Sequence, residues 1–213
     1  MSDYKGVIFD MDGTLLDSMG IWQEIDAEFL TKRGIDIPDD YMHAISHRCA
    51  YDSAVYTIDR FNLPEKPEDL IREWIDMAVS KYSDVPLKKG AKEYIHHLKK
   101  SGIKIALATA SEMPIVKAGL EDKGILPLID AITTVSEVEN GKGFPDIYLE
   151  CAKRLGLGVK DCIVFEDILM GVKGSVSGGF KTIAVYDKHS ESSAEEIKNI
   201  ADKYIYDFTE MLK

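Results

Sequence analysis

The sequence predicts an α/β fold: a parallel sheet core with helices on both faces, plus an inserted α-helical cap domain. From residue 87 onward, short unbroken apolar runs alternate with helical patterns, as expected for parallel strands buried on both faces. Residues 18–86 interrupt this alternation, because they carry helical patterns and no strand signal. A chain of 213 residues with 45% hydrophobic residues is long and apolar enough for a sizeable core and an insertion.

The elements of the expected core follow one another along the chain. The first strand is the run Val7-Ile8-Phe9, and each later strand is a similar apolar run. The helices show apolar residues three or four positions apart, and several of them end at a glycine. We expect the later strands at residues 103–108, 131–134, 162–165 and 181–185. We expect helices at about 91–100, from Ser111 as N-cap to about 124, and at 145–155. Two further helices are expected, one directly before residue 181 and one after a polar loop at 190–193.

The segment after the first strand is expected to form the cap. It begins with an amphipathic helix that ends at Gly34, and further helices are expected at about 50–62 and 67–82. This pattern divides the chain into two domains. The core domain is expected to comprise residues 1–16 and 87–213, and the cap domain residues 17–86.

Composition excludes several classes of function. The net charge of −11 would repel the phosphate backbone of a nucleic acid. The sequence contains no apolar stretch of about 20 residues and no signal-peptide pattern at its start, so we expect no membrane partner and a cytoplasmic location. Three cysteines without a CxxC spacing suggest neither a disulfide framework nor a thiolate zinc site. We expect a monomer or a small homo-oligomer.

Two carboxylates, Asp10 and Asp12, follow the first apolar strand directly. In a strand, this spacing sends both side chains to the same side, and Gly13 allows the chain to turn away from them. Carboxylates at the end of an apolar strand need a partner, such as a cation or a reacting group. An ordinary Asp-rich turn is the alternative interpretation.

A second polar feature follows the strand that ends at Ala108. Thr109 supplies a hydroxyl, and Ala110 and Ser111 are expected to open the next helix with free backbone N–H groups. A hydroxyl beside a helix N-terminus can bind an anion. A simple N-cap is the alternative interpretation.

Two further charged features complete the set. Lys142 lies between two glycines ahead of a helix, where its ammonium could reach a phosphate oxygen or simply be solvated. Glu166 and Asp167 follow the apolar run that ends at Phe165, so they could start a helix or, together with Asp10, provide the oxygen ligands that Mg²⁺ prefers. The combination of four features is much more specific than any one of them.

These residues resemble the four motifs of the haloacid dehalogenase superfamily, in its helical-cap branch of phosphatases and β-phosphoglucomutase-like proteins, which has a Rossmann-like core. The segment from Asp10 to Ser18 is similar to the first motif, Thr109 to the second, Lys142 to the third, and Glu166-Asp167 to the fourth. The order and spacing fit across essentially the whole chain.

The resemblance implies a role for each residue. Asp10 would be the nucleophile that forms an aspartyl phosphate, and Asp12 the general acid and base. Mg²⁺ would be held by the carboxylates of Asp10 and Asp167 and the backbone carbonyl of Asp12, with Glu166 close by or acting through water. Thr109 and Lys142 would bind the phosphoryl oxygens.

Substrate contacts in this branch often come from the cap. Trp22, His47 and Arg48 are therefore candidates, together with Ala110 and Ser111 of the second motif. Core packing is the alternative for Trp22, and exposure at a helix end is the alternative for His47 and Arg48.

Two positions depart from the family pattern. Gly143 replaces the usual proline after the lysine, and Ile168 replaces the usual serine after the aspartate. Neither is a catalytic side chain, so we expect altered loop stiffness and local packing. Gly171 fits the family glycine in the following helix, and we expect it to allow close packing.

The resulting prediction is a Mg²⁺-dependent phosphatase whose partner is a small phosphorylated metabolite, a sugar or nucleoside monophosphate. One alternative is a sugar phosphomutase, and another is a catalytically silent binding protein. In the sugar mutases of this branch a histidine follows the nucleophile by twelve residues, whereas this chain has Trp22 there, whose indole N–H cannot relay a proton. The phosphatase is therefore favoured.

Overall fold

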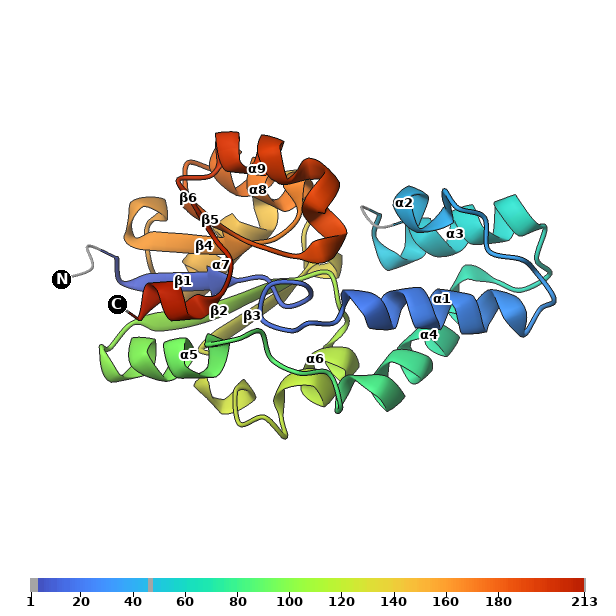
Figure 1. Ribbon diagram of the computed structural model, residues 1–213, viewed down its shortest axis with the longest axis horizontal. Helices are drawn as coiled ribbons and strands as arrows, with labels where there is room; N and C mark the ends of the chain where they lie inside the picture. The colour runs from blue at the N-terminus through green and yellow to red at the C-terminus, as the bar shows by residue number, and fades with distance from the viewer. Residues whose placement is uncertain (1–3, 46–47, 213) are drawn as a thin grey trace.

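The computed structural model describes residues 4–45 and 48–212. Within these residues, parallel strands form one six-stranded sheet in the order β3-β2-β1-β4-β5-β6, and helices cover both of its faces (Figure 1). The strands are β1 (Gly6–Phe9), β2 (Lys104–Thr109), β3 (Ala131–Thr134), β4 (Cys162–Glu166), β5 (Lys181–Val185) and β6 (Lys203–Ile205). The helices are α1 (Met19–Thr31), α2 (Tyr41–Ile45), α3 (Ala50–Phe61), α4 (Pro67–Tyr82), α5 (Ala91–Lys100), α6 (Met113–Leu120), α7 (Asp146–Leu155), α8 (Leu169–Ser177) and α9 (Ala194–Ile200).

The strand order confirms the predicted α/β fold with a Rossmann-like parallel core. β1 lies in the middle of the sheet and pairs in parallel with β2 on one side and β4 on the other. The direction in which strands are added reverses between β1 and β4, and sheets of this kind bind ligands beside such a point, at the carboxyl ends of the strands. Residues that follow β1 and end β4 are therefore brought together, and the Asp10 N–H donates to the Phe165 carbonyl over 3.0 Å.

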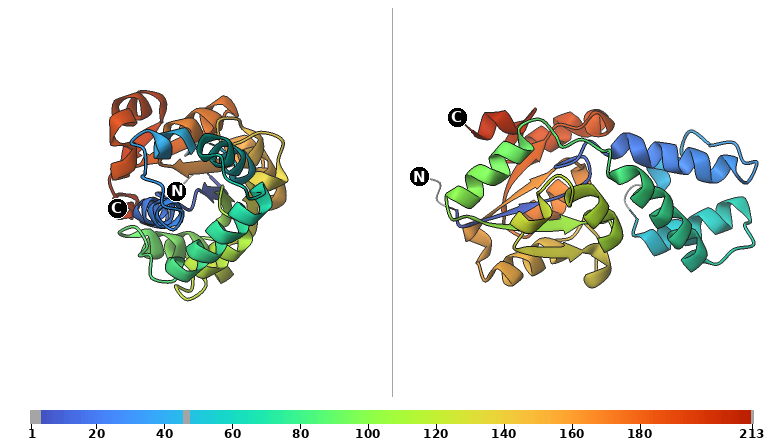
Figure 2. Two further views of the ribbon diagram at one scale, coloured as in Figure 1. Left: turned by 90° about the vertical axis from the view of Figure 1, so that its right-hand side faces the viewer. Right: turned by 90° about the horizontal axis from the view of Figure 1, so that it is seen from below.

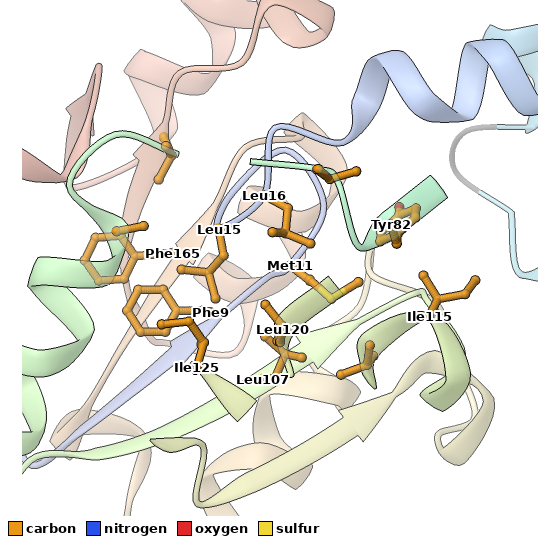
Figure 3. Packing of buried hydrophobic residues seen from close by; sticks show 14 of the residues in the cluster. Phe9, Met11, Leu15, Leu16, Tyr82, Leu107, Ile115, Leu120, Ile125 and Phe165 are labelled. Carbon is orange, nitrogen blue, oxygen red and sulfur yellow. The ribbon is translucent and has the colours of Figure 1, made fainter. Parts of the chain in front are cut away.

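The alternation of side chains along β1 divides the core into two layers. Phe9 packs with Phe165, their ring centroids 5.0 Å apart, on the face covered by α5 and by the 3₁₀ turn Phe208–Met211. Ile8 points to the opposite face, where it packs with residues of α7. Figure 3 shows the first layer continuing past the strand end through Met11, Leu15 and Leu16 toward Tyr82 at the end of α4. The loop after β1 is thus anchored by buried apolar side chains on both sides of its carboxylates.

Helices α1 to α4 lie beyond the carboxyl edge of the sheet (Figures 1 and 2). The two chain crossings that connect them to the sheet run side by side, because the Asp17 N–H donates to the Pro86 carbonyl over 3.0 Å and the Lys88 N–H to the Leu15 carbonyl over 2.8 Å. We propose that residues 17–86 form a cap domain, distinct from a core domain of residues 1–16 and 87–213.

Several details differ from the sequence-based expectation. Ser111 is not an N-cap: α6 begins at Met113 with Glu112 as its N-cap, and the Ser111 hydroxyl instead donates to a carboxylate of the site. The helix α2 and the edge strand β6 were not predicted, because a five-residue helix and a three-residue strand are too short to show a period. Among the described helices, none has the length and apolar content that a membrane span requires.

Candidate active site

Asp10, Lys142 and Glu166 form a buried ionic group at the carboxyl edge of the sheet. The Lys142 ammonium pairs with Asp10 Oδ1 and, over 2.8 Å, with Glu166 Oε1. The Tyr148 hydroxyl on α7 donates to the same Glu166 oxygen over 2.9 Å. Glu166 at the end of β4 therefore holds the lysine against Asp10, which makes Lys142 a fixed positive charge beside this carboxylate rather than a solvated loop side chain.

Asp167 adds a third carboxylate to this group. One ligand atom from each of Asp10, Glu166 and Asp167 lies within 4.8 Å of the others. Asp167 Oδ1 accepts a hydrogen bond from the Thr14 hydroxyl over 2.8 Å, whereas its buried Oδ2 has no hydrogen-bond partner among the described residues. Three buried carboxylates against a single lysine leave an excess of negative charge. The oxygen donors and the unsatisfied oxygen fit a hard divalent cation such as Mg²⁺.

The pKa values of the site follow from this crowding. Burial raises the pKa of Asp10 to about 7; Lys142 opposes this shift, and Glu166 and Asp12 add to it. Burial, then Asp10 and Glu166, raise the pKa of Asp167 well above its usual range. Burial disfavours the charge on Lys142, but Asp10 and Glu166 outweigh it and raise the lysine pKa. A bound cation would favour the ionised carboxylates that a nucleophile and metal ligands require.

Asp12 is surrounded by hydroxyl donors. Its Oδ1 accepts from the Ser18 hydroxyl over 2.7 Å and from the Tyr82 hydroxyl, and its Oδ2 accepts from the Ser111 hydroxyl over 2.7 Å. The expectation that strand alternation aligns Asp10 and Asp12 was wrong, since β1 ends at Phe9 before either residue. Asp10 instead pairs with the lysine, while Asp12 bonds to donors from the linker, from α4 and from the loop after β2. Both carboxylates line one cavity.

Glycines allow the loops of the site to approach closely. Gly13 has φ +80°, and a Cβ there would lie 2.2 Å from Asp167 Oδ2. A Cβ on Gly171 would lie 2.3 Å from the Glu166 carboxyl carbon, so the close packing expected at Gly171 is what the structure has. A Cβ on Gly143 would lie 2.6 Å from Met170 Cε, the mobile end of an exposed side chain, so the structure gives no steric reason for glycine in place of proline. Bulkier residues in place of Gly13 and Gly171 would displace the carboxylates.

The other predicted site residues have different positions. Trp22, Arg48, Ala110 and Ser111 line the same cavity as Asp10 and Asp12, and its volume is about 430 Å³. Thr109 is fully buried, and its Oγ1 accepts the Ser111 N–H over 3.0 Å. His47 lies outside the described residues.

Sequence reasoning missed two tyrosines and an acid. Tyr148 and Tyr82 lie at apolar positions of predicted helices, where a tyrosine is indistinguishable from core until its hydroxyl partner is known. Asp26, on α1, is buried and lines the cavity. The only signal for it is an acid next to the apolar stripe of an amphipathic helix.

The fold and the site define a class of α/β protein with a buried carboxylate cluster and a paired lysine at the carboxyl edge of a parallel sheet. The model of the haloacid dehalogenase-like hydrolase family matches residues 7–185. The chain belongs to this family.

Named relatives agree with this assignment. The bifunctional riboflavin kinase/FMN phosphatase of Arabidopsis thaliana is 30% identical over 198 residues, which are 91% of this chain, and the chain spans about half (52%) of that protein. Hexitol phosphatase A of Escherichia coli is 29% identical over 184 residues, which cover 85% of this chain and 82% of the relative. The crystal structure of CbbY from Rhodobacter sphaeroides in complex with phosphate has the same fold, with a TM-score of 0.87 at 22% identity over 98% of this chain and 96% of that one.

Proposed function

We propose that the chain removes phosphate from sugar or nucleoside monophosphates with Mg²⁺, through an aspartyl phosphate on Asp10. The observation that carries the proposal is the placement of Asp10: a buried carboxylate at the carboxyl end of the central strand, paired with Lys142, beside Asp167 and on the wall of a cavity. Buried carboxylates with a raised pKa on the wall of a cavity are typical of catalytic nucleophiles and metal ligands.

The chain's own residues carry both steps. In the first, an Asp10 carboxylate oxygen forms a bond to phosphorus while the ester oxygen leaves and Asp12 gives it a proton. In the second, Asp12 takes a proton from water, the water oxygen bonds to phosphorus, and the bond from phosphorus to Asp10 breaks to release inorganic phosphate. Lys142 and the Thr109 hydroxyl bind the phosphoryl oxygens, and Glu166 holds Lys142 in place.

The metal ligands we propose are the carboxylates of Asp10 and Asp167 and the backbone carbonyl of Asp12. Glu166 acts from nearby, since Lys142 and Tyr148 occupy its Oε1. When bound, Mg²⁺ neutralises negative charge on the phosphoryl group and orients it for attack.

The mutase alternative has less support. The relatives quoted above include named phosphatases. Trp22, at the position of the mutase histidine, is half-buried with its ring centroid 6.0 Å from that of Tyr82. An indole N–H can donate a hydrogen bond but cannot exchange a proton as imidazole does.

The test is to trap the intermediate. Asp12→Asn keeps the size of the side chain but cannot activate water, so incubation with p-nitrophenyl phosphate and Mg²⁺ should leave phosphate on the protein. Mass spectrometry should find the added mass on the peptide that contains residue 10. A phosphate found only on another peptide would refute the assignment, and Asp161→Asn, at a surface ion pair with Lys5, serves as the matched control that should accumulate none.

A further inference from the structure

The cap contributes mostly apolar side chains to the cavity. Sugar phosphates carry several hydroxyls, and each hydroxyl removed from water needs a hydrogen-bond partner. Aromatic rings and methyl groups cannot supply these partners. The apolar cap residues on this wall are Met19, Trp22, Met42, Ile45, Ile71, Trp74 and Ile75.

The core side of the cavity mouth has the same character. Phe144 and Met170 are 55% and 43% exposed, and both line the cavity. Ile168 and Gly143, the two departures from the family pattern, line it beside them. A serine at 168 would add a hydroxyl there, so Ile168 makes this rim more apolar. Cap and rim thus present apolar surface to whatever is attached to the phosphate.

Buried polar groups of Asp26, Ser53 and Trp74 interrupt the apolar wall of the cap, which Arg48 also lines. Asp26 on α1 is 5% exposed, and burial alone raises its pKa to about 7. Trp74 on α4 is 8% exposed, and its indole Nε1 is buried without a hydrogen-bond partner among the described residues. The unpartnered indole N–H of Trp74 is costly, and a ligand that accepts a hydrogen bond from it recovers that cost.

The position of Asp26 along α1 indicates which part of a ligand it meets. α1 leaves the core at Met19 and runs away from the sheet (Figure 1). Asp26 is two turns further, about 10 Å along the helix axis. Asp26 therefore faces the end of a substrate that is remote from its phosphate.

We propose that this part of the cavity is a specificity subsite for an aromatic nitrogen heterocycle, with Asp26 accepting from ring N–H groups and the Trp74 indole donating to a ring acceptor. The proposal rests on the proposed function and narrows its substrate class to phosphate esters of heterocyclic alcohols, of which nucleosides are one kind, rather than bare sugars. The apolar wall contacts the faces of the aromatic ring, and the two polar groups hydrogen-bond with nitrogen or oxygen atoms at its edge. A volume of about 430 Å³ accommodates such a group.

Binding can be measured without turnover. The chain has two tryptophans, Trp22 and Trp74, and both line the cavity, so quenching of intrinsic fluorescence reports its occupancy. Asp10→Asn protein with Mg²⁺ would be titrated with three phosphates that differ by one feature at a time: ribose 5-phosphate, purine riboside 5′-monophosphate and guanosine 5′-monophosphate. Ribose 5-phosphate lacks an aromatic base, the purine riboside has an aromatic base without N–H donors, and guanosine 5′-monophosphate has an aromatic base with N–H donors.

We expect the Kd to fall about tenfold or more at each step, since the ring adds apolar burial and the donors add a hydrogen bond to a charged acceptor. Asp26→Leu should abolish the difference in Kd between the two nucleotides and keep the difference between ribose 5-phosphate and purine riboside 5′-monophosphate. Asp26→Asn, which retains an acceptor oxygen, should keep most of the difference between the two nucleotides. Asp40→Asn, at an exposed cap carboxylate paired with Arg60, is the control that should change neither.

Equal affinity for ribose 5-phosphate and the two nucleotides would overturn the proposed subsite. An unchanged difference in Kd between the two nucleotides in Asp26→Leu would overturn it as well. Turnover of p-nitrophenyl phosphate separates this failure from failure of the proposed function. Circular dichroism of Asp26→Leu shows whether the variant folds, and Asp40→Asn with Asp10 intact should hydrolyse that compound at the rate of the parent. Absence of that turnover from the parent protein would contradict the hydrolase mechanism itself.

Discussion

The sheet edge and the cap wall of the cavity bury polar groups in opposite ways. At the sheet edge, Lys142 pairs with Asp10 and Glu166, and Asp167 adds a third carboxylate within a few ångströms. On the cap wall, Asp26 lies among apolar side chains, and burial alone accounts for its raised pKa. A concentrated ionic group suits chemistry on a charged phosphoryl group, whereas an isolated polar group suits recognition of one feature of a substrate. The comparison indicates that reaction and selectivity are determined in separate regions.

The largest effect should come from the nucleophile. Asp10→Asn preserves the shape of the side chain but removes the anion that attacks phosphorus, so we expect kcat for p-nitrophenyl phosphate to fall at least about a thousandfold. The protein should remain folded by circular dichroism. Steady hydrolysis within about tenfold of the parent, after contamination and deamidation have been excluded, would place the reaction elsewhere.

The second-largest effect should be on the metal requirement, which should respond to a change at the sheet edge and not to one on the cap wall. EDTA should abolish activity and Mg²⁺ should restore it, while Ca²⁺ should inhibit, because calcium accepts more ligands at longer distances and displaces the nucleophile. Asp167→Ala should raise the Mg²⁺ concentration needed for half-maximal rate, whereas Asp26→Asn should leave it unchanged. Activity that survives EDTA, or an equal shift in both variants, would remove the distinction between the ionic group and the cap wall.

Most of the sheet and its ionic group could be predicted from sequence. Unbroken apolar runs identify strands buried on both faces, and parallel strands bring their carboxyl ends to one edge, so Asp10 and Asp167 were expected to meet. Only short edge elements such as β6 were missed, since three residues show no period.

The cap wall could not be predicted in the same way. Trp22 and Asp26 lie one turn apart on α1, but helix periodicity gives no information on which neighbouring helix or cavity they face. Ser111 illustrates the same limit in the core, because its hydroxyl is equally suited to an N-cap and to the Asp12 carboxylate. Tertiary contacts decide such cases.

Asp26 should have a smaller effect, on the way the free energy of unfolding depends on pH. The pKa of Asp26 is raised from 3.8 to about 7 in the folded protein, so between these values the folded state binds more protons than the unfolded state. Stability contributed by this group is therefore lost as pH rises through 7. The neighbouring Tyr41 stays neutral across this range, because burial raises its pKa to about 12.

Asp26→Asn should remove this dependence. Relative to the parent, the variant should gain about 2 kcal/mol in the free energy of unfolding between pH 5 and pH 8.5, measured by urea denaturation. Asp40→Asn is the matched control and should show no gain with rising pH, because Arg60 lowers the pKa of Asp40. A difference between Asp26→Asn and parent that does not change with pH would mean that Asp26 is solvated, and the contrast between the two regions would weaken.

The smallest effect concerns a side chain of the cap that hydrogen-bonds to a carboxylate at the sheet edge. Tyr82 ends the cap helix α4, is fully buried, and donates to Asp12 Oδ1. Burial, with Asp12 adding to it, raises the pKa of Tyr82, so its hydroxyl stays protonated. Tyr82→Phe should lower kcat/KM for an alkyl phosphate about tenfold, since a misplaced Asp12 protonates the leaving alkoxide poorly. The nitrophenolate of p-nitrophenyl phosphate leaves without that proton, so its kcat/KM should change much less. Tyr41→Phe removes a comparable buried hydroxyl, bonded to Thr57 over 2.8 Å, and should affect both substrates equally. Equal losses for the two substrates in Tyr82→Phe would show that the tyrosine only packs, and that the cap does not position the acid.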